Sequence, residues 1–302
     1  MEPALQINGL TKEYPGFKLD HVSFTLPCGT IMGLIGENGA GKSTTINAVL
    51  DLIRKDDGNI LFWGKELSHN PRQLKEDIGV VFDGINFYET LTPVKVGKIS
   101  AAAYRQWDPA AYKGFLDQFQ LPADKEIKTF SKGMKKQLSI FLALAANTAY
   151  IICDETFDGL DPVIRQAVKS LMADAMASRE MTPIIASHNL RELEDICDHV
   201  GLLHKGGLLL SKELEDMKLS VHKLQVVFDH NKSEDEFPDL AIISNKFSGR
   251  LQTMIIRGEE EQILQQIQAA NPIFLEMLPL SLEEVFITET EVVGYEFPNL
   301  GL

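Results

Sequence analysis

A glycine-rich segment near the N-terminus has the residue types and spacing needed to bind phosphate groups. Residues 36–43 read GENGAGKS, after an apolar run and before a helical pattern. Glycines let backbone N–H groups surround phosphate oxygens, Lys42 can reach the β and γ phosphates, and the Ser43 hydroxyl can ligate Mg²⁺. The segment therefore predicts a P-loop that binds a nucleotide. Its candidate binding residues are Gly36, Glu37, Asn38, Gly39, Ala40, Gly41, Lys42, Ser43 and Thr44.

Two adjacent carboxylates follow a second apolar run. In the segment AYIICDETFDGLDP, which begins at Ala149, the apolar run ends in Asp154 and Glu155 follows. Asp154 is placed to hold magnesium through water, and Glu155 is a candidate base that orients the attacking water. A small-molecule kinase has less need of this second carboxylate, because its substrate brings the acceptor hydroxyl. The pair thus favours nucleotide hydrolysis.

A histidine follows a third apolar run. The segment PIIASHNLRELEDICD places His188 at the end of a predicted strand and before a helix. A lone histidine there is often structural, but a strand end beside the phosphate site is where a γ-phosphate sensor would lie. We interpret His188 as the sensor and count it with Lys42 and Glu155 as a candidate catalytic residue.

The segment FSKGMKKQLSIFLALAA, which begins at Phe130, predicts a helix with unusual charges in its first turns. Ser131 is a good N-cap, yet Lys132, Lys135 and Lys136 crowd the end where a helix prefers carboxylates. Each such cation costs about 0.3–1 kcal/mol at a bare N-terminus. We expect an anion outside the chain to compensate these lysines; the alternative is that they point to water.

The elements that must position these residues follow from short apolar or alternating runs. These runs predict an α/β fold with a mixed sheet of parallel and antiparallel strands. Strand signals stop from about 84 to 147, where three helical patterns predict a helical insertion. After residue 212 the pattern changes, which predicts a main domain over 1–212 and a small C-terminal α/β domain over 213–302. The predicted strands of the main domain are ALQING, HVSFTL, TIMGLIG, NILFWG, IGVVF, AYIICD, PIIASH and VGLLHKGGLLLS.

Composition narrows the classes of function. The 302 residues carry a net charge of -14, which argues against a surface that binds nucleic acid. The three cysteines lack paired metal-ligand spacing and are expected to be buried free thiols. No secretory signal and no apolar run of about 20 residues is visible, so we expect a cytoplasmic chain without a membrane span.

These motifs together resemble the nucleotide-binding subunits of ABC transporters, from about Leu5 to Ser211. The signature FSKGMKKQL is similar to a bacterial exporter branch that includes bacitracin-resistance and lantibiotic-immunity ATPases. In chain order the matching motifs are the Walker A loop at Gly36, the signature at Ser131, the Walker B residues Asp154 and Glu155, DGLDP at Asp158, and the switch histidine His188.

The resemblance implies a P-loop NTPase core of the ABC ATPase type that binds and hydrolyses ATP with Mg²⁺. It further implies a homodimer or heterodimer of ATPase subunits with two ATP molecules trapped between them. Closure of this dimer would power the separate transmembrane permease of an exporter. The chain would then be peripheral on the inner face of the cell membrane, and no nucleic acid is expected as a partner.

The resemblance also implies roles for residues that the motifs alone do not identify. Ser131 and Gly133 would face the ATP held by the other subunit, and Tyr14 would stack on adenine unless it is an ordinary surface tyrosine. Asp161 would lie at the interface between the two ATPase subunits. Asp83 occupies a position where the family usually has glutamine, and its carboxylate is expected to act as a ligand on the magnesium side.

Two other classes of function stay open at this stage. One is a soluble ABC-type ATPase that acts on nucleic acid or in translation, but the long coiled coil, zinc modules or basic surface of such proteins are missing. The other is a phosphate-loop kinase or GTPase, but no Asn-Lys-x-Asp guanine reader is present. The transporter ATPase is therefore the favoured hypothesis.

Overall fold

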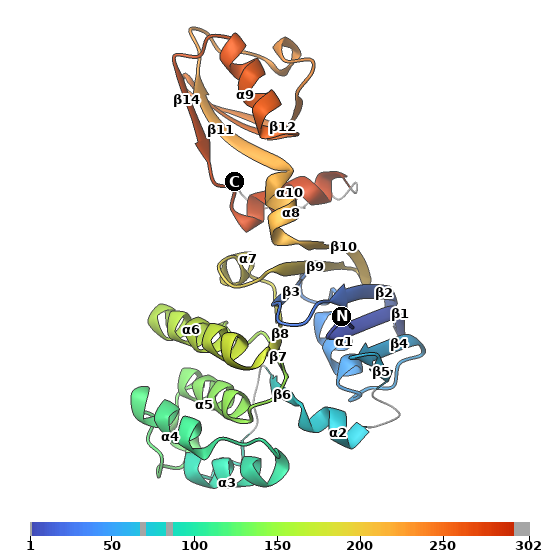
Figure 1. Cartoon of the computed structure of the whole chain (residues 1–302), viewed down its shortest axis with the longest axis vertical. Helices are drawn as coiled ribbons and strands as arrows, with labels where there is room; N and C mark the ends of the chain where they lie inside the picture. Colours follow the sequence, from blue (N-terminus) through green and yellow to red (C-terminus); the bar gives the residue numbers. More distant parts are fainter. Residues whose placement is uncertain (1, 67–70, 83–86, 293–302) are drawn as a thin grey trace. The chain divides into compact units, whose positions relative to one another are not determined.

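The computed structural model describes residues 2–66, 71–82 and 87–292 (Figure 1). The chain divides into two compact units, residues 1–211 and 212–302. The first unit contains two sheets and most of the helices, and the second contains one sheet. Within the described residues, none of the helices has both the length and the apolar character required to cross a membrane.

An antiparallel sheet with the order β2-β1-β4-β5 begins the first unit. Its first two strands form a hairpin through the Pro15–Gly16 turn, where Gly16 has a φ of +85°. That left-handed conformation suits glycine, which has no Cβ. The strands are β1 (Leu5–Tyr14), β2 (Phe17–Leu26), β4 (Asp57–Phe62) and β5 (Lys65–Glu66).

A six-stranded sheet with the order β10-β9-β3-β8-β7-β6 forms the centre of the first unit. Strands β3, β7 and β8 are buried along their whole length, as is typical of parallel strands covered on both faces. The predicted combination of parallel and antiparallel strands is thus confirmed. The strands are β3 (Met32–Ile35), β6 (Ile78–Val81), β7 (Tyr150–Asp154), β8 (Thr182–Ser187), β9 (His199–His204) and β10 (Gly207–Glu213).

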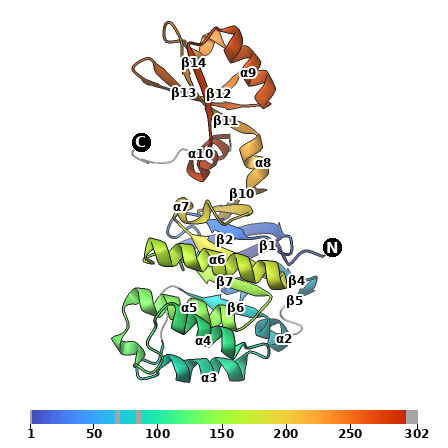
Figure 2. The same cartoon turned by 60° about the vertical axis from the view of Figure 1, so that its left-hand side comes forward.

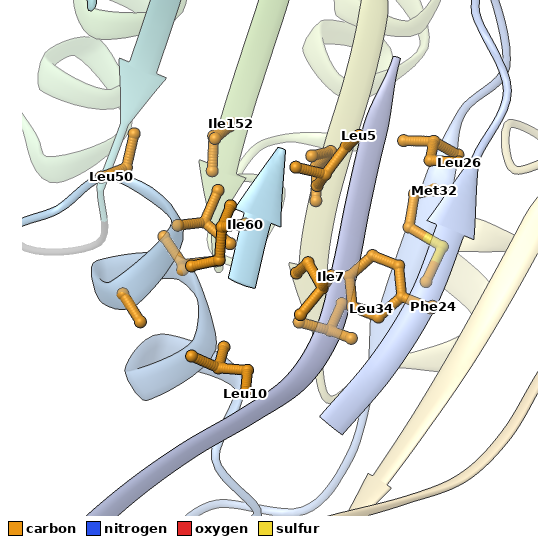
Figure 3. Close-up of a cluster of buried hydrophobic side chains, with 14 of the residues drawn as sticks. Leu5, Ile7, Leu10, Phe24, Leu26, Met32, Leu34, Leu50, Ile60 and Ile152 are labelled. Atoms are coloured by element: carbon orange, nitrogen blue, oxygen red, sulfur yellow. The ribbon is translucent and has the colours of Figure 1, made fainter. Parts of the chain in front are cut away.

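An apolar core lies where these two sheets meet (Figure 3). Leu5, Ile7 and Phe24 come from the antiparallel sheet, and Leu34 and Ile152 come from the parallel strands. Full burial of one such side chain contributes about 1.5–3 kcal/mol. This core holds β3 and β7, the two strands that lead into the predicted site.

Helices α3, α4 and α5, which lie within the range expected for a helical insertion, group together in both views (Figure 2). The Phe141 ring of α5 packs against Phe115 and Phe119, with ring centroids 5.4 and 4.7 Å apart. The Tyr112 hydroxyl donates to the Pro93 carbonyl, which joins α4 to α3. The helices of the first unit are α1 (Lys42–Val49), α2 (Pro71–Glu76), α3 (Pro93–Ala103), α4 (Pro109–Gln118), α5 (Lys132–Ala145), α6 (Pro162–Arg179) and α7 (Leu190–Leu193), with a 3-10 turn at Ile127–Thr129.

The second unit has an antiparallel sheet with the order β12-β13-β11-β14. Alternate residues of β11 and β13, such as Leu224 and Met254, pack with Ile263 and Ile267 of α9 in a core of their own. The elements are α8 (Leu214–Leu219), β11 (Val221–Val227), a 3-10 turn (Glu234–Glu236), β12 (Ala241–Ser248), β13 (Leu251–Arg257), α9 (Glu260–Ala269), β14 (Phe274–Leu278) and α10 (Leu282–Val292).

The cysteines are free thiols, as expected. Cys153 and Cys197 are buried, whereas Cys28 is half-buried, so the expectation of burial holds fully for two of the three. Burial raises the pKa of the Cys153 thiol to about 12, because an apolar environment disfavours the thiolate. Its thiol is therefore unreactive at neutral pH.

Candidate nucleotide site

Three neighbouring parallel strands deliver the predicted motifs to one edge of the central sheet. Strand β8 lies between β3 and β7. Ile35 at the end of β3 pairs with Ser187, and Asp154 at the end of β7 pairs with Ala186. The loop after β3, the carboxylates after β7 and His188 after β8 therefore meet at the carboxyl edge, where α/β sheets bind ligands.

The geometry of the phosphate loop depends on two of its glycines. A Cβ added to Gly36 would lie 2.5 Å from the Leu203 carbonyl oxygen. Gly41 has a φ of +112°, and a Cβ there would lie 2.8 Å from Leu19 Cδ1. Between them, the Ala40 amide donates to the Glu37 carbonyl at 3.0 Å and closes the loop. Helix α1 begins directly afterwards, at Lys42.

A pocket of about 390 Å³ opens over this loop. Its floor is the loop and the first residues of α1, so the backbone N–H groups at the helix N-terminus favour an anion there. The lining residues are Phe17, Glu37, Asn38, Gly39, Gly41, Lys42, Ser43, Thr44 and Glu155. The other two loop residues of the prediction, Gly36 and Ala40, shape the loop without lining the pocket.

Lys42, Glu155 and His188 lie together in one cluster. The Lys42 ammonium donates to the Gly36 carbonyl at 2.6 Å and lies 3.4 Å from Glu155 Oε1. The other carboxylate oxygen, Oε2, lies 2.7 Å from His188 Nδ1, a distance at which a protonated Nδ1 donates a hydrogen bond. Side chains that follow three different strands thus converge beside the pocket.

The backbone of Glu155 is in an unusual conformation. Its φ is +48°, in the left-handed region that residues other than glycine rarely adopt. Its amide donates to the Ala186 carbonyl at 2.9 Å. Such a conformation costs about 1 kcal/mol or more, and neighbouring contacts must hold it in place.

The donors available for a metal ion are oxygens. Ser43 lines the pocket, and Asp154, only 8% exposed, lies at the end of β7. Among the described residues, no group of three or more histidine, cysteine or acidic side chains could hold a metal. A hydroxyl and one carboxylate fit Mg²⁺, which commonly takes few protein ligands and completes its shell with phosphates and water. The predicted ligand Asp83 lies outside the described residues.

An aromatic side chain that sequence reasoning missed lies at the pocket. Phe17 lines it, whereas Tyr14, the predicted adenine-stacking residue, is 43% exposed and does not line it. Tyr14 lies opposite Phe17 in the β1–β2 hairpin, with the Lys12 ammonium 5.4 Å from the centre of its ring. The Pro-Gly turn between the two aromatics is the sequence signal that could have indicated Phe17.

The structure places the predicted signature residues at the start of α5, away from the pocket lining. Ser131 is the N-cap, and its hydroxyl accepts a hydrogen bond from the Met134 amide at 3.2 Å. Gly133 follows in the first turn. Neither residue lines the pocket of its own chain, so their role toward a nucleotide stays a prediction.

The expectation for the lysines of this helix needs a correction. The Lys136 ammonium is buried and donates to the carbonyl oxygens of Glu155 and Asp158, each at 2.6 Å. Lys135 lies 3.5 Å from the Glu89 carboxylate. Two of the three lysines are therefore compensated within the chain, because helix packing brings acceptors that sequence proximity does not show. Only Lys132 is solvent-exposed, as the alternative expected.

Sequence comparisons with known proteins point to one family. The family model described as ABC transporter matches residues 19–158. The chain is 32% identical over 290 residues to the ABC transporter ATP-binding protein YtrB of Bacillus subtilis, covering 94% of this chain and 97% of that protein. It is 33% identical to the bacitracin transport ATP-binding protein BcrA of Bacillus licheniformis, covering 72% of each.

A solved structure is similar to this fold. It is the ATP-binding subunit of an ABC transporter, with a TM-score of 0.66 and 29% sequence identity. The match covers 71% of this chain and 92% of that one.

Proposed function

The chain belongs to the family of ABC transporter ATP-binding proteins, and we propose that it is the ATP-hydrolysing subunit of an exporter. As a member of this family it binds and hydrolyses ATP. In the proposal, ATP-dependent closure of two such subunits moves a separate transmembrane permease. The relative BcrA is a bacitracin transport protein by name, and this likeness supports the choice of an exporter.

The cluster of Lys42, Glu155 and His188 beside the phosphate pocket is the observation that carries the proposal. Lys42 would bind the β and γ phosphates. Glu155 would accept a hydrogen bond from the water whose oxygen attacks the γ phosphorus. His188, 2.7 Å from the Glu155 carboxylate, would hold that carboxylate in place and reach the γ-phosphate. Lys42 and Glu155 line the pocket over α1, and His188 lies beside the Glu155 carboxylate.

Ser43 and Asp154 would hold Mg²⁺ at this site. When bound, the ion neutralises charge on the β and γ phosphates. Asp83 is proposed as a further ligand on the same side. The adenine would lie toward the β1–β2 hairpin, where Tyr14 and Phe17 offer aromatic faces.

The active form is proposed to be a head-to-tail dimer, either of two copies or with a related ATPase subunit. Ser131 and Gly133 would meet the ATP bound to the partner's phosphate loop. Their position at the N-terminus of α5 supports this role, because the amides of the first helical turn and the helix dipole favour an anion. Asp161, the N-cap of α6, would lie at the interface between the two subunits.

The permease is proposed to dock on the helical insertion. Tyr88 is 81% exposed and Ile99 on α3 is 56% exposed, which are large apolar side chains to leave in water. Through this contact the subunit would lie on the inner face of the cell membrane. The alternative partner, nucleic acid, is disfavoured because its phosphates would repel a chain with a net charge of -14.

The Glu155→Gln variant tests the proposal. Glutamine keeps the size of the side chain but cannot act as the base, so hydrolysis should fall about 10²- to 10⁴-fold. The variant should then form dimers on size exclusion with Mg-ATP and remain monomeric without it. The wild type under both conditions is the control. A monomer at saturating ATP, or hydrolysis at the wild-type rate, would contradict the proposal.

A further inference from the structure

The side chain of Lys136 links the signature helix to the loop that carries Glu155. Lys136 lies in the second turn of α5 and is 3% exposed. Its ammonium donates to the Glu155 and Asp158 carbonyl oxygens at 2.6 Å each. These acceptors lie 19 and 22 positions away in the sequence. The contact is therefore a tertiary one between two separate motifs.

A buried ammonium is an unusual choice for a packing role. Removing a charge from water is unfavourable unless hydrogen bonds to polar groups compensate it. Bonds from a charged donor are short and strong, and the two carbonyls hold two of the three N–H groups of Lys136. The loop is thus fixed more firmly than an apolar side chain of similar length could fix it.

The loop that Lys136 holds is the one that most needs external contacts. Glu155 has a φ of +48°, and its amide is held by Ala186 while its carbonyl is held by Lys136. Two residues beyond Asp158, the Leu160 carbonyl accepts from Arg165 Nη2 at 3.4 Å. Hydrogen bonds thus hold the backbone of Glu155 at both its amide and its carbonyl. They fix the position from which its carboxylate contacts Lys42 and His188.

We propose that Lys136 is a positioning residue that holds the Glu155 carboxylate in its catalytic place. The inference rests on the proposed role of Glu155 as the base. Ser131 and Gly133 begin the same helix, five and three residues before Lys136. An anion that binds at this helix start would shift the helix. Its next turn holds the loop that carries Glu155, so that loop would shift with it. Lys136 thereby connects the signature segment to the attacking water.

Lys136→Met tests this inference, because methionine fills the space and removes the donors. We expect kcat to fall about 10- to 100-fold, since a displacement of about 1 Å at a reacting group has effects of this size. KM and the dissociation constant of a fluorescent ATP analogue should stay within about 2-fold. Lys136→Arg should restore part of kcat, because a guanidinium keeps donors but in a different geometry.

Lys169→Met is the matched control. Lys169 is 7% exposed on α6 and pairs with Asp195, so the variant also removes a buried ammonium, but outside the site. Its kcat should equal that of the wild type. If Lys136→Met does not fold, the kinetics of Lys136→Arg are used to test the positioning role. Positioning then requires a reduced kcat with unchanged nucleotide affinity, and a wild-type kcat or a loss of affinity would overturn it.

A double variant separates positioning from general support. In the Glu155→Gln background, Lys136→Met should hardly lower the residual hydrolysis further, because the base it positions is already missing. A full additional loss, or a wild-type kcat in the single variant, would overturn the inference and leave the proposed function intact. Wild-type hydrolysis by Glu155→Gln alone would instead refute the catalytic assignment, and the inference with it.

Discussion

Gly133 has room for a methyl group within this chain. A Cβ added there would meet nothing closer than the Gly159 carbonyl oxygen at 3.8 Å. Alanine is also the better helix former by about 1 kcal/mol. The fold of a single subunit therefore does not require this glycine. A close approach of the helix start to the partner's ATP would require it.

Gly133→Ala should therefore impair closure and leave folding intact. We expect hydrolysis to fall about 10- to 100-fold, because a methyl group would push the phosphate away by about 1 Å. ATP affinity of the single chain should stay within about 2-fold of the wild type, as measured by nucleotide titration. Gly114→Ala on α4, where a Cβ also has free space, is the control. An equal loss of affinity and hydrolysis would contradict the closure model.

The positions of some site residues could be predicted from the sequence, and those of others could not. Lys42, Glu155 and His188 each follow an apolar run, and the carboxyl ends of parallel strands meet at one edge of a sheet. Their convergence could be predicted for that reason. The contacts of Phe17 and Lys136 could not, because they depend on strand pairing and helix packing between distant segments.

Elements with strong local signals were predictable, and the edge strand β14 was not. Helix α4 begins with an aspartate followed by proline, a clear helix start, and β12 and β13 flank a Ser-Gly turn. Strand β14 has five residues and pairs along one edge of β11, so its conformation depends on a neighbour far away in the sequence. Its segment FLEML also lacks the continuous apolar run that identifies equally short buried strands such as β7.

The N-cap of α4 should contribute measurably to stability. The Asp108 carboxylate accepts hydrogen bonds from the amides of Ala110 and Ala111, both at 2.9 Å. Asp108→Ala leaves these amides without that acceptor, and we expect the free energy of unfolding to fall by about 1 kcal/mol. Denaturant unfolding followed by circular dichroism measures the change.

Asp108→Asn is the comparison that isolates the cap. Asparagine is an equally good N-cap without the charge, so it should retain most of the stability. Equal losses in both variants would show that the charge matters more than the cap. No loss in either variant would show that the cap does not stabilise this helix.

At the scale of the whole molecule, each of the two units has an apolar core among its described residues. One is built around the two sheets of the first unit, and the other lies between the sheet and α9 of the second. YtrB is matched over 94% of this chain, whereas the solved subunit is matched over 71%, close to the share that residues 1–211 make up.

This division predicts that the first unit folds and binds ATP without the second. A chain of residues 1–213 would keep edge strand β10 (Gly207–Glu213) whole, together with its pairing to β9. We expect a cooperative thermal transition, because the apolar core between the two sheets of the first unit lies within these residues. ATP affinity should equal that of the full chain, since all the residues that line the phosphate pocket are present. Residues 214–302 expressed alone should show a separate transition. An aggregated or unfolded 1–213 chain, with the full chain folded under the same conditions, would show instead that the first unit depends on the second.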